Sequence, residues 1–252
     1  MNLTGPQIVT LILLDLVRLT KPGVKTIDLN NHAEKMIASF GVKSYNKGYC
    51  PPGAIKPFPY AVCINTGNVI AHGFPGDEIL VDGELVSYDL AIIDKEGNCA
   101  DAAITVGVGE ISPAKKRLLY YAYKTMMAGV EQLYPGKNTE EIARNIEQYA
   151  MARGYKINRR FCGHGIGREM HEQPKIYNTT EKTHKYAVLE EGQIVCVEPM
   201  ITYGADDIGV MDSNGWICRT ADGKPSAFFE VMVKITKEGP EILTKHITPP
   251  EL

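Results

Sequence analysis

The sequence lacks an excess of basic residues, a closely spaced cysteine pair and a long apolar run. Its 27 Lys and Arg against 30 Asp and Glu give a formal net charge of −3. The sequence therefore lacks the excess of positive charge that is typical of nucleic-acid-binding proteins. The six cysteines form no CxxC pair and no zinc-finger spacing, which favours free thiols in a reducing, cytoplasmic compartment. Tryptophan occurs once, as Trp216, so we expect this side chain to have a role other than core packing.

No stretch of the sequence reads as a membrane span or a signal peptide. The most apolar amino-terminal run, residues 8–19, is too short to cross a bilayer and is interrupted by Asp15 and Arg18. It has neither a basic leading region nor a cleavage site of small residues. The preceding Thr-Gly-Pro favours an amphipathic helix instead, because proline suits the first helical position.

Two segments of the sequence match each other and predict an internal duplication. Residues 22–41 (PGVKTIDLNNHAEKMIASFG) and 135–154 (PGKNTEEIARNIEQYAMARG) share Pro-Gly, Thr, Glu and terminal Gly positions. Each predicts a turn, an N-cap Thr, an amphipathic helix and a closing Gly, after an earlier helix at 6–19 or 113–133. A second pair, 82–89 and 191–198, matches in the same order.

We therefore predict one catalytic domain over residues 1–252, built from two related halves at about 6–110 and 113–245. Each half reads helix, helix, strands, which predicts an α+β fold with helices packed on antiparallel strands around a pseudo-twofold axis.

Four acidic residues lie within predicted strands that are otherwise apolar. They are Asp89 in residues 85–93, Asp101 in 98–106, Glu198 in 193–201 and Glu230 in 227–233. Strands without polar alternation are expected to be buried on both faces. A buried ionised carboxylate is costly unless it is paired or binds metal, and none of these runs contains Lys or Arg. Together the four acids predict a site for concentrated positive charge, best supplied by two divalent cations.

Three histidines are candidates for the same site. His164 lies in a Gly-rich turn, and His171 follows it seven residues later. His72 comes directly after an apolar strand, at an element end where functional groups often gather. His32 and His184 are expected to be solvent-exposed and without a role.

The predicted ligand set is rich in oxygen. Four carboxylates and one imidazole suit Mn, Fe(II), Co or Zn as a bridged pair better than a thiolate-bound structural zinc. Two such ions about 3.5–4 Å apart activate water and polarise a carbonyl group. The pattern therefore predicts hydrolysis of an amide or ester.

These motifs resemble those of the type I methionine aminopeptidases, which have the pita-bread fold. The matching features are NVIAHG at 68–73, the two hairpin acids, GHGIGxxxHExP at 163–174, EPM at 198–200 and the last glutamate. They occur in the family's order and span residues 20–245. The resemblance implies removal of the amino-terminal methionine from nascent proteins whose second residue is small.

The resemblance also implies individual metal ligands. Asp89 corresponds to the terminal ligand of one metal, and His164 and Glu198 to ligands of the other. Asp101 and Glu230 correspond to the two bridging carboxylates.

Catalytic and substrate-binding roles follow from the same resemblance. Glu198 would shuttle the proton of the attacking water, His72 would bond near the scissile nitrogen, and His171 would stabilise the oxyanion. The methionine side chain would be held in an apolar slot. Its lining residues would be Phe58, Cys63, His72, Phe161, Met170, His171 and Trp216. Core packing is the alternative reading for the apolar members other than Trp216.

The chain departs from the family pattern at several positions near the ligands. Ala91 replaces the usual Thr, Ala100 the usual Gly and Val231 the usual His, and the turn at 94–98 is one residue longer. Loss of hydrogen-bond partners around ligands costs about 10–100-fold in metal affinity or activity, so we expect a weakened site.

The remaining expectations concern subtype, partners and rival functions. Only 26 residues separate His171 from Glu198, which leaves no room for the helical insert of type II enzymes. No Cys/His-rich amino-terminal extension precedes the domain, so docking to the ribosome through zinc modules is not expected. We expect a monomer that acts on nascent polypeptide amino ends, with no membrane partner. The alternatives are an X-Pro aminopeptidase or prolidase, and a non-catalytic or weakly active peptide-binding paralogue.

Overall fold

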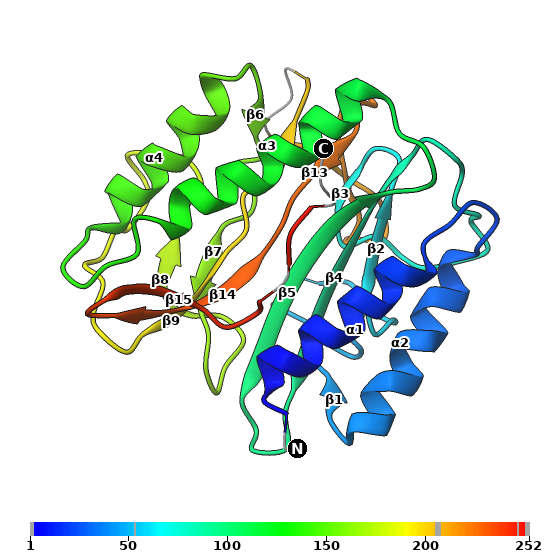
Figure 1. Ribbon diagram of the computed structural model, residues 1–252, viewed down its shortest axis with the longest axis horizontal. Helices are drawn as coiled ribbons and strands as arrows, with labels where there is room; N and C mark the ends of the chain where they lie inside the picture. Colours follow the sequence, from blue (N-terminus) through cyan, green and yellow to red (C-terminus); the bar gives the residue numbers. More distant parts are fainter. Residues whose placement is uncertain (1–2, 53, 205–207, 246, 250–252) are drawn as a thin grey trace.

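Two pairs of helices pack beside a set of antiparallel strands (Figure 1). The computed structural model describes residues 3–52, 54–204, 208–245 and 247–249. Within them the helices are α1 (Gly5–Leu19), α2 (Thr26–Phe40), α3 (Pro113–Val130) and α4 (Thr139–Met151). Helix α1 lies against β4 and β5, α2 packs on α1 and β1, and α3 and α4 lie over the strands of the second half (Figure 1).

The strands form four small sheets within the described residues. In chain order they are β1 (Lys43–Ser44), β2 (Cys63–Thr66), β3 (Val69–Ala71), β4 (Leu85–Ile93), β5 (Cys99–Gly107), β6 (Lys156–Ile157), β7 (Gly163–Gly165), β8 (Glu172–Ile176), β9 (Ile194–Val197), β10 (Ile201–Thr202), β11 (Val210–Met211), β12 (Cys218–Arg219), β13 (Ser226–Ala227), β14 (Val231–Thr236) and β15 (Gly239–Ile242). The sheet orders are β1-β4-β2 with β5 on β4, β13-β10-β6, β11-β12-β3 and β15-β14-β9-β7-β8, and all the pairings between them are antiparallel.

The first helix begins where the sequence predicted it. Pro6 lies in its first turn, and the backbone N–H of Thr4 donates to the Gln7 side chain at 2.9 Å. Its apolar residues recur at helical spacing, and Ile12 and Leu16 are fully buried against the sheet. Burial of each such side chain stabilises the fold by about 1.5–3 kcal/mol.

The two matched Pro-Gly segments adopt the same local structure. Gly23 and Gly136 have φ angles of 90° and 85°, which glycine adopts without a steric penalty. Their N–H groups donate to the carbonyl groups of Leu80 and Leu189 at 2.9 and 2.8 Å. These equivalent contacts support the predicted duplication, although the boundaries of its halves stay a prediction.

The predicted helix caps were wrong by one residue. Lys25 and Asn138 are the N-caps, and Thr26 and Thr139 are the first helical residues. The Thr26 hydroxyl accepts from the N–H of Gly76, and the Thr139 hydroxyl accepts from the N–H of Ala187. The hydroxyls are used in tertiary contacts, which a local capping pattern does not reveal.

The two halves meet where β5 runs beside the segment that leads into β14 (Figure 1). Ala103 and Glu230 form an isolated antiparallel bridge there. Strands β4 and β5, nine residues each, pair along their whole length and are almost entirely buried. This confirms that Asp89 and Asp101 lie within strands.

Two of the predicted strand positions were wrong. Glu198 follows the end of β9, and Glu230 precedes β14. Pro199 cannot donate a ladder hydrogen bond, which explains why the strand ends before it. The apolar runs therefore continue beyond the regular strands, and both acids lie on the irregular segments that border them.

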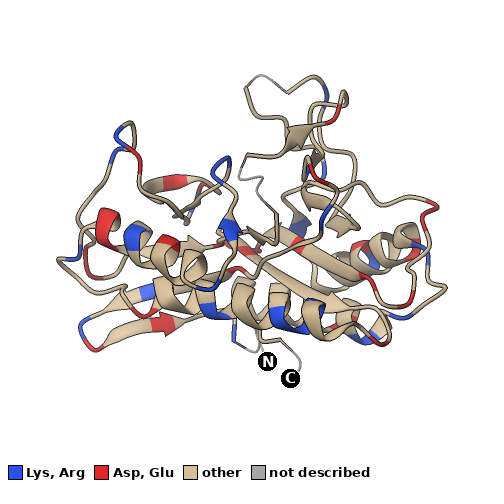
Figure 2. Cartoon of the chain, turned by 90° about the horizontal axis from the view of Figure 1, so that it is seen from above, with Lys and Arg blue, Asp and Glu red and all other residues tan. Residues whose placement is uncertain are grey.

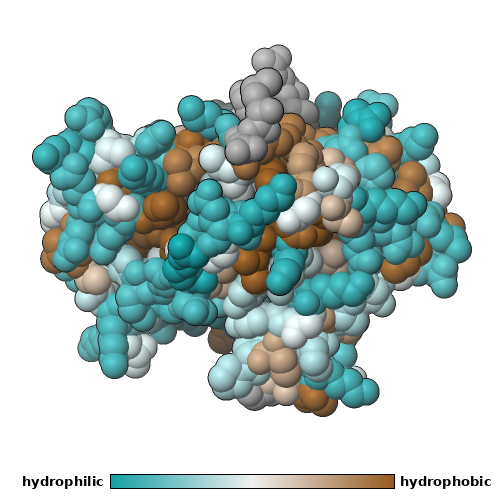
Figure 3. Space-filling view, turned by 90° about the horizontal axis from the view of Figure 1, so that it is seen from below, coloured by the Kyte–Doolittle hydropathy of each residue, from teal (hydrophilic) through white to brown (hydrophobic). Residues whose placement is uncertain are grey.

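The surface is of mixed charge. Lys and Arg alternate with Asp and Glu along the helices and loops (Figure 2). On the face seen in Figure 3, hydrophilic side chains predominate and apolar ones show between them. Among the described residues, no helix is long and apolar enough to cross a membrane.

Candidate metal centre and peptide cavity

A cavity of about 320 Å³ brings the predicted site residues together. Its walls come from both halves of the chain. They include every predicted metal ligand and both predicted catalytic histidines, namely His72, Asp89, Asp101, His164, His171, Glu198 and Glu230. They also include the predicted pocket residues Phe58, Cys63, Phe161, Met170 and Trp216.

Three of the acids converge closely enough to share an ion. Carboxylate oxygens of Asp89, Asp101 and Glu230 all lie within 4.8 Å of one another. Asp89 pairs with Ala103 in the β4–β5 ladder. Asp101 lies two residues before Ala103, so Asp89 and Asp101 project from the same face of the sheet. The bridge from Ala103 to Glu230 brings in the third carboxylate from the second half.

The electrostatics of the acids show that they repel one another. Burial, followed by the neighbouring carboxylates, raises the pKa values of Asp101, Glu198 and Glu230 well above their usual range. Burial raises the pKa of Asp89 to about 7, although a Cys63 hydrogen bond opposes the rise. Such shifts cluster at functional sites.

The same acids carry unsatisfied oxygens. Asp101 Oδ1 and Glu230 Oε1 are buried without a hydrogen-bond partner among the described residues. Buried polar atoms are rarely left so. Because carboxylates are the preferred ligands of hard divalent cations, this cluster of oxygens fits divalent metal.

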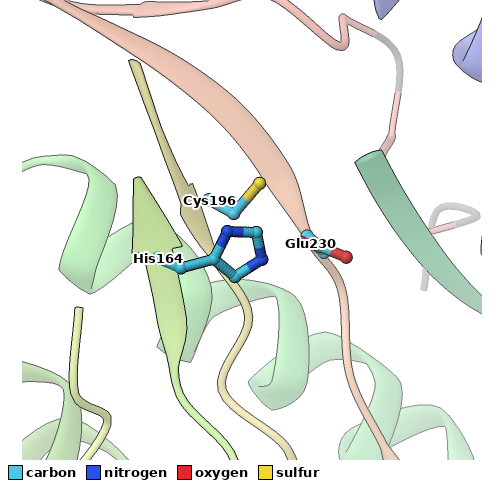
Figure 4. A group of neighbouring side chains, drawn as sticks. All are labelled: His164, Cys196 and Glu230. Carbon is cyan, nitrogen blue, oxygen red and sulfur yellow. The ribbon is translucent and has the colours of Figure 1, made fainter. Parts of the chain in front are cut away.

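The His164 ring lies beside Cys196 and Glu230 (Figure 4), and a backbone contact fixes its orientation. Its Nδ1 lies 2.9 Å from the Gly165 carbonyl oxygen, so Nδ1 carries the proton and Nε2 is available as a donor atom. Nε2 lies 3.7 Å from a Glu198 oxygen. Burial lowers the pKa of His164 to about 3, which keeps the ring neutral at pH 7. A neutral ring is the form that binds metal.

Sequence analysis missed a thiol in this cluster. Cys196 Sγ lies within 4.8 Å of ligand atoms of both His164 and Glu230, and the three side chains are neighbours (Figure 4). The thiol was assigned only as a free, reduced cysteine. Its position two residues before Glu198 was the available signal, since residues two apart share one face of a strand. The six cysteines are unpaired, as predicted.

His72 has a backbone conformation that is unusual for its type. Its φ of 57° lies in the left-handed region, and such residues concentrate at functional sites. The ring lies edge-on to those of Phe161 and Trp216, with centroids 5.3 and 5.8 Å away. Burial lowers its pKa to about 4, so the imidazole is neutral at pH 7.

His171 lies at the mouth of the cavity. Its ring centroid is 4.6 Å from that of His164, and its Nδ1 is 3.5 Å from the Tyr49 hydroxyl. Partial burial, and then the charge of Lys175, lowers its pKa. Tyr49 was not predicted, because no short motif links it to His171 in the sequence.

Phe58, Cys63 and Trp216 form a separate apolar cluster beside the acids. Phe58 and Trp216 meet edge-to-face with centroids 5.3 Å apart, and the indole N–H donates to the Lys56 carbonyl at 2.8 Å. Because this cluster lines the cavity, it is placed to receive an apolar side chain. Substrate binding by these residues stays a prediction.

The expectation for His32 and His184 was wrong in one respect. His32 and His184 are half-buried rather than exposed. His32 pairs with Asp15, and His184 stacks on Tyr177 with centroids 3.7 Å apart. Neither histidine lines the cavity. Their partial burial comes from the contacts with Asp15 and Tyr177.

The departures from the family pattern differ in their surroundings. Ala100 and Val231 belong to the main hydrophobic core, and neither lines the cavity. Ala91 does line it and lies directly opposite Asp101 in the β4–β5 ladder. A side chain at position 91 projects to the same face of the ladder as Asp101, so a hydroxyl there would be placed beside that carboxylate.

The chain belongs to metallopeptidase family M24, whose profile matches residues 7–237. It is similar to methionine aminopeptidases. It is 37% identical to that of Clostridium perfringens, over 89% of this chain and 86% of the relative. It is 36% identical to that of Aquifex aeolicus, over 95% and 93%. The crystal structure of the Rickettsia prowazekii methionine aminopeptidase superposes with a TM-score of 0.88 at 32% identity, over 95% of this chain and 94% of that one. The predicted pita-bread fold is thereby confirmed.

A prolidase shares the fold alone. The Pyrococcus furiosus prolidase superposes with a TM-score of 0.71 at 23% identity, and the match covers 96% of this chain but 61% of that one.

Proposed function

We propose that this metallopeptidase removes the amino-terminal methionine from nascent proteins whose second residue is small. The observation that carries the proposal is one cavity that holds both a carboxylate–imidazole cluster and an apolar aromatic pocket. The carboxylate–imidazole cluster suits the metal ions that hydrolysis needs. The aromatic pocket suits the thioether side chain of methionine. The similarity to methionine aminopeptidases supports the choice of substrate.

The metal cofactor of this proposal is a pair of divalent ions, with Co, Mn, Fe(II) and Zn all compatible with the donors. Asp89, Asp101 and Glu230 would hold one ion, and His164 and Glu198 would complete the site of the other with the shared acids. When bound, such ions lower the pKa of water and polarise a carbonyl group.

The chain's own residues then bind the peptide and move its protons. Glu198 takes the proton from the attacking water and delivers it toward the leaving amine. His72, neutral at pH 7, donates a hydrogen bond near the scissile nitrogen. His171, at the mouth of the cavity, donates to the developing oxyanion. Phe58 and Trp216 hold the methionine side chain and exclude water from it.

We further propose a cytoplasmic monomer that acts on nascent chains as they leave the ribosome. Six unpaired thiols support a reducing compartment.

The test is a metal-dependent assay on the peptide Met-Ala-Ser. Chelation should abolish release of methionine, and Mn, Co or Fe(II) should restore it. A matched Ala-Pro peptide separates this activity from that of an X-Pro aminopeptidase, and metal analysis of the purified protein separates an enzyme from a peptide-binding paralogue. Full activity in a verified metal-free sample, or cleavage of Ala-Pro alone, would contradict the proposal.

A further inference from the structure

A lysine lies beside the candidate metal ligands on the wall of the cavity. Lys175, in β8, is the direct cross-strand partner of His164 in β7. Cross-strand partners project to the same face of a sheet, so the lysine stem runs along the cavity with the imidazole. Lys175 lines the cavity and is half-buried.

The ammonium of Lys175 acts on the site without being paired in it. Its charge contributes to the lowered pKa values of His164 and His171 and opposes the rise in that of Glu198. The side-chain ammonium of Lys175 nevertheless makes no hydrogen bond or ion pair in the part of the chain that the structure describes, so its N–H donors are available to a ligand.

A second cation lines the same cavity at the surface. Arg160 is exposed, and its guanidinium donates to the carbonyl groups of Ile208 and Gly209 at 3.2 and 3.5 Å. These contacts hold the side chain at the rim, and no acidic side chain pairs with the guanidinium among residues 3–52, 54–204, 208–245 and 247–249. Among the described residues, the acids on the cavity wall are the four of the candidate metal cluster, so the described part of the rim is positive once that cluster binds metal.

The positive charges of Lys175 and Arg160 restrict which part of a bound peptide can lie next to them. A free amino-terminal ammonium is repelled by Lys175 and Arg160, because all three groups are positively charged. The residues that follow the scissile bond are therefore the part of the substrate that passes the cations.

We propose that Lys175, assisted by Arg160, binds a carboxylate on the substrate within the first residues after methionine, an inference that rests on the proposed function. The carboxylate comes either from an acidic side chain or from the carboxyl end of a very short peptide. The enzyme thereby favours acidic amino-terminal sequences and short peptides over basic ones.

The test compares four peptides under one metal condition. They are the amides Met-Ala-Glu, Met-Ala-Gln and Met-Ala-Lys, and the free acid Met-Ala-Gln. We expect KM for the Glu amide to be about five-fold below that for the Gln amide, the range of a partly screened ion pair, with kcat little changed. The Lys amide should have the highest KM. A low KM for the free acid shows recognition of the carboxyl end, and a low KM for the Glu amide shows recognition of the side chain.

Variants of Lys175 separate charge recognition from a structural role. Lys175→Gln should bring the Glu-to-Gln ratio of KM close to one, and Lys175→Arg should retain the preference. Lys116→Gln, on the exposed face of α3, makes the same charge change away from the cavity and should leave the ratio as in wild type. Added salt should reduce the wild-type preference.

The outcomes distinguish this inference from the function beneath it. Cleavage of all four peptides with equal KM would overturn carboxylate recognition and leave the methionine activity standing. If Lys175→Gln kept the preference for the Glu amide, a group other than Lys175 would be the one that recognises the carboxylate, and the proposal would be overturned. Failure to cleave any of the four with metal present would overturn both.

Discussion

The backbones of Ala103 and Glu230 are hydrogen-bonded to each other in both directions. The N–H of Glu230 donates to the Ala103 carbonyl at 2.9 Å, and the reverse bond is 3.3 Å long. This bridge joins the first half of the chain to the second. It also sets Glu230 against Asp101, which lies two residues from Ala103 on the same face of β5. The repulsion between the two acids is therefore built into the backbone pairing.

Neutralising either of these acids should reduce metal binding. Asp101→Asn or Glu230→Gln replaces a carboxylate by a neutral amide, which is a poor bridging ligand. We expect the metal content of the purified protein, measured by elemental analysis, to fall below half of the wild-type value. Glu110→Gln, an exposed acid outside the cavity, is the control and should keep its metal. Unchanged metal content in both site variants would show that the ions lie elsewhere.

The substitution Asp101→Asn should stabilise the metal-free protein at alkaline pH. A buried acid whose pKa is raised on folding stabilises the fold below its unfolded pKa and loses this contribution as pH rises through the folded pKa. For Asp89 that window runs from about 4 to about 7. With chelator at pH 8, the free energy of unfolding of Asp101→Asn should exceed that of wild type by on the order of 1–3 kcal/mol.

Denaturant titrations at two pH values test this expectation. The difference between the two proteins should shrink at pH 5, which lies below the raised pKa of about 7 of Asp89. Added divalent metal should reverse the order at pH 8, because only wild type gains full binding energy. A metal-free variant less stable than wild type at pH 8 would refute mutual repulsion.

The two cavity histidines that are not metal ligands should affect turnover and leave metal content intact. His72→Asn, which tolerates the left-handed backbone better than alanine, and His171→Ala should each lose about 10²–10⁴-fold in kcat. Elemental analysis and kinetics on one preparation provide both readouts. His32→Ala, outside the cavity, is the matched control. If His171→Ala emptied the site, the ligand and catalytic roles would have to be exchanged.

Selectivity for the second residue should follow from crowding at the cavity mouth. Met-Ala and Met-Gly peptides should be cleaved faster than Met-Leu by about 10²-fold or more, because a displacement of about 1 Å near the reacting carbonyl has that cost. A bulky second side chain would press on the loop that bears His72 and Phe74. Leucine in place of methionine should be a poorer substrate by about 1–3 kcal/mol. Equal cleavage of Met-Ala and Met-Leu would indicate a broad aminopeptidase.

The apolar cluster should contribute to substrate affinity rather than to metal binding. Trp216→Ala removes a ring that packs edge-to-face on Phe58, so KM for Met-Ala-Ser should rise about 10-fold or more. Trp216→Phe keeps an aromatic ring but loses the bond to the Lys56 carbonyl, and should give an intermediate KM. Equal KM values for Trp216→Ala and wild type, with metal content unchanged, would place the methionine pocket elsewhere.

The sequence predicted the candidate metal ligands because their signal is local. An acid in an apolar run, such as Asp89, stands out by its immediate neighbours. A Gly-rich turn around His164 stands out in the same way. The placements of Glu198 and Glu230 within strands were wrong, since apolar composition does not reveal where ladder pairing stops. Tyr49 and Lys175 carry no local signal that separates them from ordinary surface or core residues, and the signal for Cys196 was only its spacing of two residues from Glu198.

What the sequence determined by itself is the helices, the long hairpin of β4 and β5, the order of the motifs and the identity of the acids. These depend on contacts between residues a few positions apart, which spacing and turn chemistry express directly. Only the tertiary structure decided that Ala103 pairs with Glu230, that Lys175 faces the cavity beside His164, and that Ala100 and Val231 turn into the core. Those outcomes depend on backbone pairing and burial between segments up to 127 residues apart, whose free energy is gained only when the two halves pack together.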